Sequence, residues 1–524
     1  MSSTNVSTPF RNEPFTDFEA AGEREAFLKA LGKVKGEFGK HYPVVIEGQP
    51  IHTGDDEIRS LNPAEPDEIV GFVSKAGLGL AERAMQSAQR MFEFWKRTSA
   101  ADRAELLLRA ASLMRARKHE FSAWMVYEAG KNWGEADADT AEAIDFMEFY
   151  AREAVRLSQT SRLQPLTPVD GEDNILRYIP LGVGIIIPPW NFPLAICAGM
   201  TSAAVVSGNT VILKPASTTP VIAYKFFELM KEAGLPDGVI QYLPGSGGEI
   251  GDYLTGHPKT RFISFTGSKE VGLHINKLAA EQAEGQIWIK RVVAEMGGKD
   301  GVIVDETADL DAAAAAIVAS AFGYQGQKCS AGSRAIIVDS VYDDIVSRVT
   351  ELTQQLEVGA PEANAKIGPV IDRASYNKIL DYIEIGKREG RLVAGGSGAE
   401  GSGYYIQPTI FADVDPKARV MQEEIFGPVL AMTSAADWEQ AIRIYNDTEF
   451  GLTGSFFSSR EDRIEAAYER VHCGNLYINR KCTGALVGAQ PFGGFNMSGT
   501  DSKAGGHDYL LLFTQAKVIS RKLT

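Results

Sequence analysis

The residues best suited to chemistry lie in one short stretch, Phe322 to Arg334, with Cys329 at its centre. Gly323 and Gly326 precede the cysteine and three small residues follow it, so the backbone can turn sharply and a substrate can approach the sulfur. A thiolate is a strong nucleophile, but most isolated cysteines are small buried hydrophobic residues. The stretch therefore predicts a nucleophile only if the rest of the chain supplies the other groups that such chemistry needs.

A thiol that attacks an aldehyde needs an oxyanion site, a hydride acceptor, and a base that activates water against the resulting thioester. Asn191, in PPWNFP, follows a predicted strand, where its amide can join the backbone N–H of Cys329 at an oxyanion or can simply shape the turn. Glu295 ends the predicted strand VVAEM before two glycines, which suits either a general base or a solvated carboxylate. No histidine accompanies the cysteine in sequence, which counts against a Cys–His hydrolase, and no ligand spacing predicts a metal.

Length and composition narrow the class of protein. The 524 residues exceed one hydrophobic core and predict about three structural units. A net charge of -15 counts against nucleic-acid and anionic-membrane partners, so small molecules are the expected substrates. The four cysteines are too scattered for a disulfide framework, the amino terminus lacks a signal-sequence pattern, and the longest apolar run cannot cross a bilayer. We therefore expect a cytoplasmic enzyme, or a mature organellar one.

The elements that must position these residues follow an α/β pattern. Three helical stretches are predicted between Leu80 and Leu157, and from Ile175 short apolar strands alternate with helices, which predicts a parallel sheet with crossover helices. Strands at 211–213 and 262–265 lead through polar loops into helices, where open α/β sheets bind nucleotides. No Gly-x-Gly-x-x-Gly is present; instead FTGSKEVG puts Gly267 and Ser268 at a helix start, where they hold a pyrophosphate or form an ordinary cap.

A second α/β series follows Met296 and contains an alanine-rich helix at 310–322, the Cys329 loop and a helix near 342–356. The tail from Pro491 is glycine-rich and ends in a strand-like segment with apolar residues to bury. An arm that packs on a partner subunit would explain this pattern. We therefore expect a homo-oligomer.

Six motifs carry a resemblance to a known family. PPWNFP, KPAS, FTGSKEVG, EMGGKD, GQKCSAGSR and EEIFGPVL occur in the order seen in the aldehyde dehydrogenase superfamily, which the chain resembles from about Leu80 to its end. The resemblance implies an α/β fold with a Rossmann-type parallel cofactor domain, a second α/β catalytic domain and a small oligomerisation β-flap, in a dimer or dimer-based assembly. The implied parts are an NAD-binding domain (1–155 and 176–295), a catalytic domain (296–488) and oligomerisation arms (156–175 and 489–524).

The same resemblance implies residue roles. Cys329 is the implied nucleophile, Glu295 the base for deacylation and Asn191 the oxyanion donor. The residues implied to bind NAD are Pro189 and Trp190 in the cleft, Lys214 and Glu424 at the ribose hydroxyls, Gly267 and Ser268 at the pyrophosphate, and Phe426 at the nicotinamide.

Ser217 departs from the pattern of many NAD-selective members, which carry a glutamate three residues after the lysine of KPAS. The absence of that glutamate removes a repulsion against the 2'-phosphate of NADP. NAD remains the expected cofactor because no arginine stands in that motif, and some NADP use is predicted.

The stretch from Gly474 to Gly506, with YINRK and TGALVG, indicates the substrate. It resembles the branch of the superfamily that oxidises L-glutamate γ-semialdehyde, in equilibrium with 1-pyrroline-5-carboxylate, to L-glutamate in the second step of proline catabolism. The resemblance implies that Ser330 and the amides of Gly484 and Ala485 anchor the α-carboxylate. Consecutive N–H groups in a glycine turn form an anion nest, to which a hydroxyl adds a donor.

The resemblance also implies that Phe192 and Phe492 pack against the aliphatic chain and that Glu142 binds the α-ammonium group. By its helical pattern alone, Glu142 fits a solvated helix face, and Glu135 is close enough in sequence to take the same role.

Three other functions stay open. A dehydrogenase of another semialdehyde, such as succinate or aminoadipate semialdehyde, is disfavoured by the anchor-loop residues. A cofactor-independent thiol acylhydrolase leaves FTGSKEVG and EEIFGPVL unexplained, and a catalytically silent relative conflicts with intact Cys329, Glu295 and Asn191. The sequence contains no proline dehydrogenase-like barrel, so a stand-alone enzyme is expected.

Overall fold

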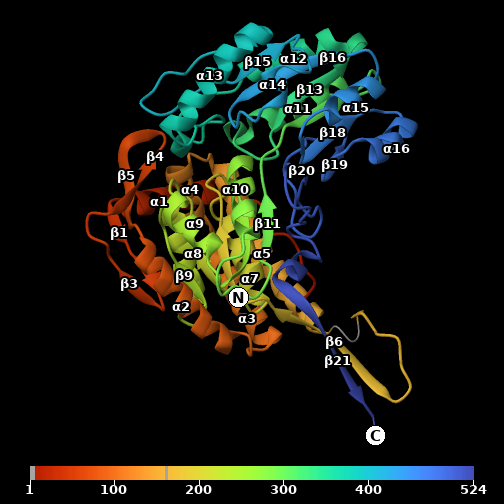
Figure 1. The fold of residues 1–524 in the computed structure, drawn as a ribbon. Helices are drawn as coiled ribbons and strands as arrows, with labels where there is room; N and C mark the ends of the chain where they lie inside the picture. Colours follow the sequence, from red (N-terminus) through yellow and green to blue (C-terminus); the bar gives the residue numbers. More distant parts are fainter. Residues whose placement is uncertain (1–5, 7, 160–162, 524) are drawn as a thin grey trace.

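The structure, a computed structural model, describes residues 6, 8–159 and 163–523. Two seven-stranded sheets with helices on both faces form two lobes, and a two-stranded ribbon projects from them (Figure 1). Within the described residues no helix combines the length and the apolar character needed to cross a bilayer. The predicted α/β architecture with parallel sheets is confirmed.

The first sheet has the order β11-β10-β7-β8-β9-β2-β3, with β7 to β11 parallel and β2 and β3 antiparallel at one edge. Its strands β7 and β8 are apolar throughout and alternate between two cores. Ile185 and Ile212 pack with one helical layer, whereas Ile186 and Leu213 pack with the other. The strands are β2 (Val44–Ile46), β3 (Gln49–Ile51), β7 (Val183–Ile187), β8 (Thr210–Leu213), β9 (Ile240–Tyr242), β10 (Thr260–Thr266) and β11 (Arg291–Glu295).

Helices cover both faces of this sheet (Figure 1). Those that follow its strands are α7 (Ala195–Val206), α8 (Pro220–Glu232), the π-helical turn η1 (Gly247–Gly251), α9 (Asp252–Gly256) and α10 (Lys269–Ala280). Those that precede β7 are α1 (Ala21–Lys35), α2 (Leu78–Trp95), α3 (Ala100–Ala116), α4 (Lys118–Ala129) and α5 (Trp133–Ser158). A small sheet of β1 (Lys40–Tyr42), β4 (Glu57–Asn62) and β5 (Glu65–Ser74) lies beside them.

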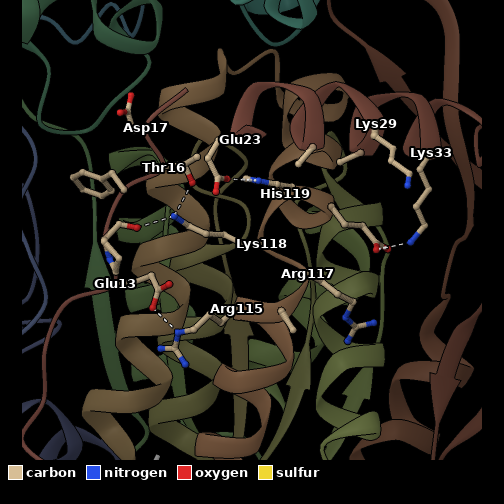
Figure 2. Close-up of a pocket in the computed structure, with 16 residues that line it drawn as sticks. Glu13, Thr16, Asp17, Glu23, Lys29, Lys33, Arg115, Arg117, Lys118 and His119 are labelled. Atoms are coloured by element: carbon tan, nitrogen blue, oxygen red, sulfur yellow. Dashed lines mark hydrogen bonds and ion pairs between the residues drawn. The ribbon is translucent and has the colours of Figure 1, made fainter. Parts of the chain in front are cut away.

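The prediction of three helical stretches between Leu80 and Leu157 was wrong, because the second stretch is interrupted at Arg117. Figure 2 shows side chains that lie on both sides of this break. Arg115 at the end of α3 pairs with Glu13 at 2.6 Å, and Lys118 at the start of α4 donates to the carbonyl of Pro14 at 2.8 Å. The amino-terminal segment thus binds both sides of the break, which no proline or glycine marks in the sequence.

The second sheet has the order β14-β15-β16-β13-β12-β18-β19, all parallel except β14. Along β12, Val302 and Val304 pack with α11 and α12, and Ile303 packs with α13, α15 and α16 on the other face. The strands are β12 (Asp300–Val304), β13 (Gly332–Val338), β14 (Arg391–Ala394), β15 (Thr409–Ala412), β16 (Val429–Ala435), β18 (Thr453–Phe457) and β19 (Asn475–Ile478); the helices are α11 (Leu310–Phe322), α12 (Tyr342–Gln354), α13 (Arg373–Glu389), α14 (Arg419–Gln422), α15 (Trp438–Asn446) and α16 (Glu461–Arg470).

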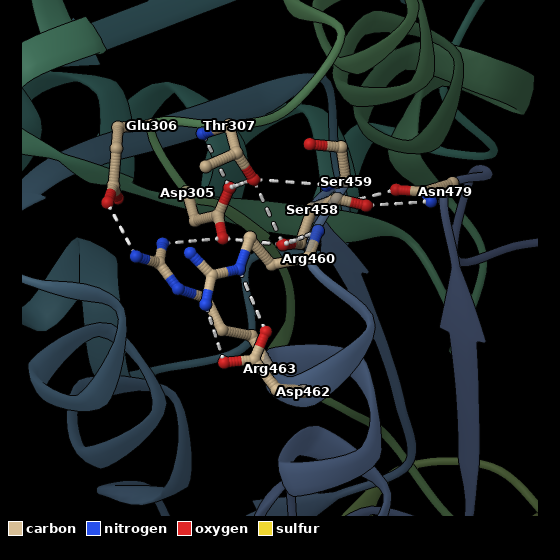
Figure 3. Close-up of polar contacts among 9 residues, drawn as sticks. All are labelled: Asp305, Glu306, Thr307, Ser458, Ser459, Arg460, Asp462, Arg463 and Asn479. Atoms are coloured by element: carbon tan, nitrogen blue, oxygen red, sulfur yellow. Dashed lines mark hydrogen bonds and ion pairs between the residues drawn. The ribbon is translucent and has the colours of Figure 1, made fainter.

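The carboxyl ends of β12 and β18 are joined by a polar network (Figure 3). Asp305 is fully buried there and accepts hydrogen bonds from the Thr307 amide at 2.8 Å, the Ser458 hydroxyl at 2.6 Å and Arg463 at 2.9 Å. These side chains bond to one another and link two strands whose following helices lie on opposite faces of the sheet. The opposite, amino end of β12 begins at Asp300 and faces the Cys329 loop.

The projecting ribbon pairs β6 (Glu172–Pro180) with β21 (Thr514–Lys522) in antiparallel register (Figure 1). After Thr514 every residue of β21 is exposed, including Val518 and Ile519. The predicted terminal strand is therefore present. The tail reaches it through β20 (Phe495–Asn496), which pairs with β17 (Phe450–Gly451), and through η5 (Tyr509–Phe513); the other 3-10 turns are η2 (Gly323–Gly326), η3 (Asp339–Val341) and η4 (Pro361–Ala363).

Candidate functional site

Cys329 follows a turn with an unusual backbone conformation. Tyr324, Gln325 and Gly326 have φ of 50°, 55° and 67°, so three successive residues are left-handed. A side chain at Gly326 would collide with the carbonyl of Gly427. Left-handed conformations are costly for non-glycine residues and persist where the surroundings enforce them. The glycines predicted this turn, but Tyr324 and Gln325 share the strained conformation.

Side-chain hydrogen bonds hold that turn in place. The Tyr324 hydroxyl donates to the carbonyl of Ala129 at 2.8 Å, and the Gln325 amide donates to the carbonyls of Pro369 at 2.9 Å and Gly130 at 3.2 Å. Tyr324 and Gln325 are almost completely buried. The position of the cysteine is therefore set by residues from both lobes.

Burial raises the pKa of the Cys329 thiol, and the carboxylates of Asp300, Glu295 and Glu424 add to this effect. The thiol form is therefore favoured, and attack requires removal of its proton. A Cβ at Gly298 would lie 2.7 Å from the carbonyl oxygen of Cys329, so the glycines of EMGGKD allow the two segments to approach. The end of β11 therefore lies beside Cys329.

Asn191 lies against the Cys329 loop. Its side-chain Nδ2 donates to the carbonyl of Gln327 at 3.0 Å, and only 5% of the residue is exposed. Asn191 therefore contacts the backbone two residues before Cys329. Its action on an oxyanion stays a prediction.

Glu295 ends β11, and its carboxyl group is enclosed by the carboxyl-terminal segment. Its Oε2 accepts from the Gly494 amide at 3.2 Å, and its Oε1 accepts from the Ser502 hydroxyl. Burial raises the pKa of Glu295 to about 8, although both donors and Lys503 lower it. A carboxylate of this basicity suits a general base near neutral pH. Nothing in the local sequence predicts Gly494 and Ser502 as the hydrogen-bond partners of Glu295.

The predicted cofactor residues of the first lobe lie at one edge of its sheet. Pro189 and Trp190 follow β7, Lys214 follows β8, and Gly267 and Ser268 follow β10. The carboxyl ends of parallel strands form the usual ligand crevice of such sheets. The structure therefore brings these five residues together.

Individual residues at this edge differ in their surroundings. Lys214 is 6% exposed, and burial alone lowers its pKa to about 8. No described residue pairs with its ammonium group, so a polar ligand at this edge would satisfy it. Ser268 caps α10, because its Oγ accepts from the Val271 amide at 3.4 Å, and Ser217 is exposed.

Glu424 and Phe426 approach this edge from the second lobe. Glu424 Oε1 accepts from the Gly298 amide at 3.1 Å. The rings of Phe426 and Trp190 meet edge to face, with centroids 5.4 Å apart. Phe426 has φ of 60°, so its ring position depends on a strained backbone. The two lobes thus meet where a nicotinamide ring is expected.

The residues predicted to hold a carboxylate lie beside the cysteine. Ser330 is 8% exposed, and its carbonyl lies 3.5 Å from the sulfur of Cys482, just before the Gly484 turn. No described residue accepts a hydrogen bond from the amides of Gly484 and Ala485, whereas Arg480 binds the carbonyl of Gly484 at 3.3 Å. The amides are thus available to an anion.

The predicted contacts of the aliphatic chain come from opposite parts of the chain. Phe192 follows Asn191 and lies under a fully buried lysine, with Nζ of Lys131 4.1 Å from its ring centroid. Phe492 is half-buried and pairs through its backbone with Ala504. The sequence reasoning missed Lys131, which forms a 3.0 Å ion pair with buried Asp139.

The structure separates the two glutamates proposed for the ammonium group. Glu135 forms an ion pair with Lys328 at 2.7 Å, and despite burial its pKa is lowered, mainly by Lys328 and then Lys131. Burial raises the pKa of Glu142 to about 8, with further contributions from Asp139 and Asp145. No described residue donates a hydrogen bond to Glu142. Its half-buried position beside other carboxylates favours a cationic ligand over a solvated face.

In the part of the chain that the structure describes, no cluster of three or more His, Cys, Asp and Glu side chains could hold a metal. The fold and this site define a two-lobed α/β enzyme with a half-buried cysteine between the carboxyl-end crevice of the first sheet and the turn at Gly484. Residues 51–519 match the model of the aldehyde dehydrogenase family, and the chain belongs to that family. The match begins at residue 51, whereas the motifs in the sequence predicted a resemblance that starts at about Leu80.

The relatives are similar over nearly their whole length. A 1-pyrroline-5-carboxylate dehydrogenase of Geobacillus kaustophilus (strain HTA426) is 61% identical over 513 residues, which cover 98% of this chain and 99% of the relative. A protein of the same name from Bacillus subtilis (strain 168) is 57% identical over 516 residues, with the same coverage. The structure of the Thermus 1-pyrroline-5-carboxylate dehydrogenase with bound NAD matches at a TM-score of 0.97 and 51% identity, over 98% of this chain and 99% of that chain. The predicted family and fold are confirmed.

Proposed function

We propose that this enzyme oxidises L-glutamate γ-semialdehyde, in equilibrium with 1-pyrroline-5-carboxylate, to L-glutamate with NAD, the second step of proline catabolism. The observation that carries the proposal is that hydrogen-bond donors for a substrate carboxylate lie next to Cys329. Ser330 adjoins Cys329, and the unpaired amides of Gly484 and Ala485 lie on the adjacent turn. The similarity to named dehydrogenases over 98% of the chain supports the same substrate.

The chain's own residues account for the steps on sulfur. Cys329 attacks the aldehyde carbon as the thiolate, after its proton has passed to water, and the amide of Asn191 with the backbone N–H of Cys329 stabilises the oxyanion of the thiohemiacetal. When bound, NAD supplies the hydride acceptor for oxidation to the thioester. Glu295, with a pKa near 8, takes a proton from the water that hydrolyses the thioester.

The substrate residues have complementary charges. Ser330, Gly484 and Ala485 present donors to the α-carboxylate, and Glu142 presents a carboxylate to the α-ammonium group. Phe192 and Phe492 exclude water from the aliphatic chain between them. Glu135 is excluded from the ammonium role by its ion pair with Lys328.

The first-lobe crevice fits NAD because it offers an unpaired buried ammonium and a helix start. Lys214 and Glu424 would hold the ribose hydroxyls, and Gly267 with the capped start of α10 would meet the pyrophosphate. Pro189, Trp190 and Phe426 would line the nicotinamide end. Exposed Ser217 carries no charge that would repel a 2'-phosphate, so some NADP use is expected.

The division proposed from the sequence is an NAD-binding domain (1–155 and 176–295), a catalytic domain (296–488) and oligomerisation arms (156–175 and 489–524); residues 160–162 of the first arm lie outside the described residues. The exposed apolar residues of β21 suit a homo-oligomer built from dimers. Four free cysteines suit the reducing cytoplasm, where we place the enzyme.

Absorbance at the NADH band tests the proposed reaction. Protein, NAD and racemic 1-pyrroline-5-carboxylate are expected to produce NADH, while succinate semialdehyde gives a much lower kcat/KM. Cys329→Ala is the control and is expected to be inactive. Activity on succinate semialdehyde without activity on pyrroline-5-carboxylate would overturn the substrate assignment.

A further inference from the structure

Both oxygens of the Glu295 carboxyl group are held by one segment of the distant carboxyl terminus, Gly493–Ser502. The Gly494 amide donates to Oε2 at 3.2 Å, and the Ser502 hydroxyl donates to Oε1. Ser502 is 2% exposed, and its hydroxyl lies 207 positions along the chain from the glutamate. The proposed reaction uses Glu295 and assigns nothing to Ser502.

The segment is built closely around the carboxyl group. A Cβ at Gly493 would lie 2.9 Å from Oε1 of Glu295, and one at Gly499 would lie 3.1 Å from Oε2. A side chain at Gly493 would also collide with the carbonyl of Ser502, and one at Gly499 would meet the carbonyl oxygen of Ala294 at 2.9 Å. The two glycines therefore let this segment approach both the Glu295 carboxyl group and the neighbouring main chain.

Main-chain bonds fix this segment to the strand that carries the glutamate. The Met296 amide donates to the carbonyl of Ser498 at 2.7 Å, and the Thr500 amide donates to the carbonyl of Ala294 at 2.9 Å. The Thr500 hydroxyl accepts from the Ala294 amide at 3.0 Å. Because these bonds lie on both sides of Glu295, the Ser502 hydroxyl has a fixed position relative to β11.

We propose that Ser502 is a positioning residue that orients the Glu295 carboxylate for hydrolysis of the cysteine thioester. A donor to one carboxylate oxygen fixes the rotation of the carboxyl plane and leaves the remaining lone pairs directed toward a water. The inference rests on the proposed role of Glu295 as the base. It concerns the step after acylation, so Ser502 is not expected to affect attack by Cys329.

The hydroxyl also favours the ionised form of Glu295, because a hydrogen bond donated to a carboxylate stabilises its charge. The other titratable groups that act on Glu295 are Lys503, which favours ionisation, and Asp501, which opposes it. Cys329 and Tyr509 face it from other elements. Removal of the Ser502 hydroxyl leaves these groups in place, so its effect on the titration of Glu295 can be isolated.

Hydrolysis of p-nitrophenyl acetate tests the proposal without the semialdehyde. Acylation of the cysteine releases p-nitrophenolate in a burst, and the later steady rate reports thioester hydrolysis. For Ser502→Ala we expect an unchanged burst, a steady rate about tenfold lower at pH 7, and a rising limb of the pH–rate profile moved to higher pH. Ser502→Thr keeps the hydroxyl. Its pH–rate profile is expected to have the rising limb at the same pH as the parent.

Ser498→Ala is the matched control, because Ser498 is also buried in this segment but its hydroxyl accepts from the Gly451 amide at 3.1 Å. Its pH profile is expected to equal that of the parent. In a Glu295→Gln background, Ser502→Ala is expected to cause no further loss in the steady rate.

A parent-like steady rate and pH limb in Ser502→Ala would overturn the proposal. If Ser502→Ala does not fold, Ser502→Cys provides the test, since a thiol is a weaker donor of similar size; an intermediate shift supports the proposal and no shift overturns it. Hydrolysis of the ester by Cys329→Ala at the parent rate would instead refute the role of Cys329, and with it the proposed function.

Discussion

The buried ion pair of Lys131 and Asp139 allows a quantitative test of how the substrate pocket is held. Both side chains are fully buried, and Nζ lies 3.0 Å from Oδ2. At this separation the Coulomb attraction is about 5 kcal/mol for an effective dielectric constant of about 20. Lys131 also lies 4.1 Å and 4.3 Å from the ring centroids of Phe192 and Tyr324.

Lys131→Met removes the charge and keeps a similar volume. It leaves Asp139 buried with only the Ala195 amide, 2.6 Å from Oδ1, as a donor. Loss of one partner of a buried pair typically costs about 3–5 kcal/mol, because the remaining charge has no compensation. We expect the free energy of unfolding to fall by about this amount, and KM for the semialdehyde to rise because Phe192 loses its support.

Urea unfolding of Lys131→Met, Asp139→Leu and the double variant measures the coupling between the two residues. The double variant is expected to recover most of the stability, because no unpaired charge remains. Lys225→Met is the control, since its lysine pairs with partly exposed Glu37 at 3.4 Å and half-exposed Glu228 at 3.6 Å. A loss below about 1 kcal/mol in Lys131→Met, which is the range of a surface pair, would refute the reasoning.

Four further predictions concern the reaction. Glu295→Gln is expected to release one equivalent of NADH in a burst and then stall at the thioester; multiple turnovers at the parent rate would exclude it as the base. Turnover limited by deacylation should rise with pH up to about 8, because burial raises the pKa of Glu295 to about 8 and only its ionised form accepts a proton, and a flat profile from pH 6 to 9 would contradict this. Ser330→Ala should raise KM by about tenfold through loss of one charge-assisted hydrogen bond, with kcat nearly unchanged; an unchanged KM would remove it from the anchor. Ser217→Glu should lower kcat/KM for NADP more than for NAD, and equal losses would place Ser217 away from the 2'-position.

Much of the architecture could be predicted because it depends on local patterns. The short strands predicted at 211–213 and 262–265 lie within β8 and β10, VVAEM covers most of β11, and the alanine-rich stretch predicted α11 with its observed bounds, Leu310–Phe322. Short motifs with small residues around Cys329, Asn191 and Glu295 indicated the chemistry, because glycine and small side chains are required where backbone and ligand approach closely.

Other features depended on contacts between distant segments. The contacts of Glu13 and Pro14 at the Arg117 break and the ion pair of Glu135 with Lys328 join residues far apart in the sequence. Local periodicity carries no information about such partners.

The sequence by itself determined the family and most of the order of the elements, and it indicated Cys329 as the nucleophile, since these depend on residue type and local spacing. Only the tertiary structure decided how Cys329 and Glu295 are held. Tyr324 and Gln325 keep a strained turn through bonds to Ala129 and Pro369, and Ser502 reaches Glu295 across 207 positions. Burial raises the pKa of Glu295. This burial is a property of the packed interior, because it requires both lobes and the terminal segment to be in place.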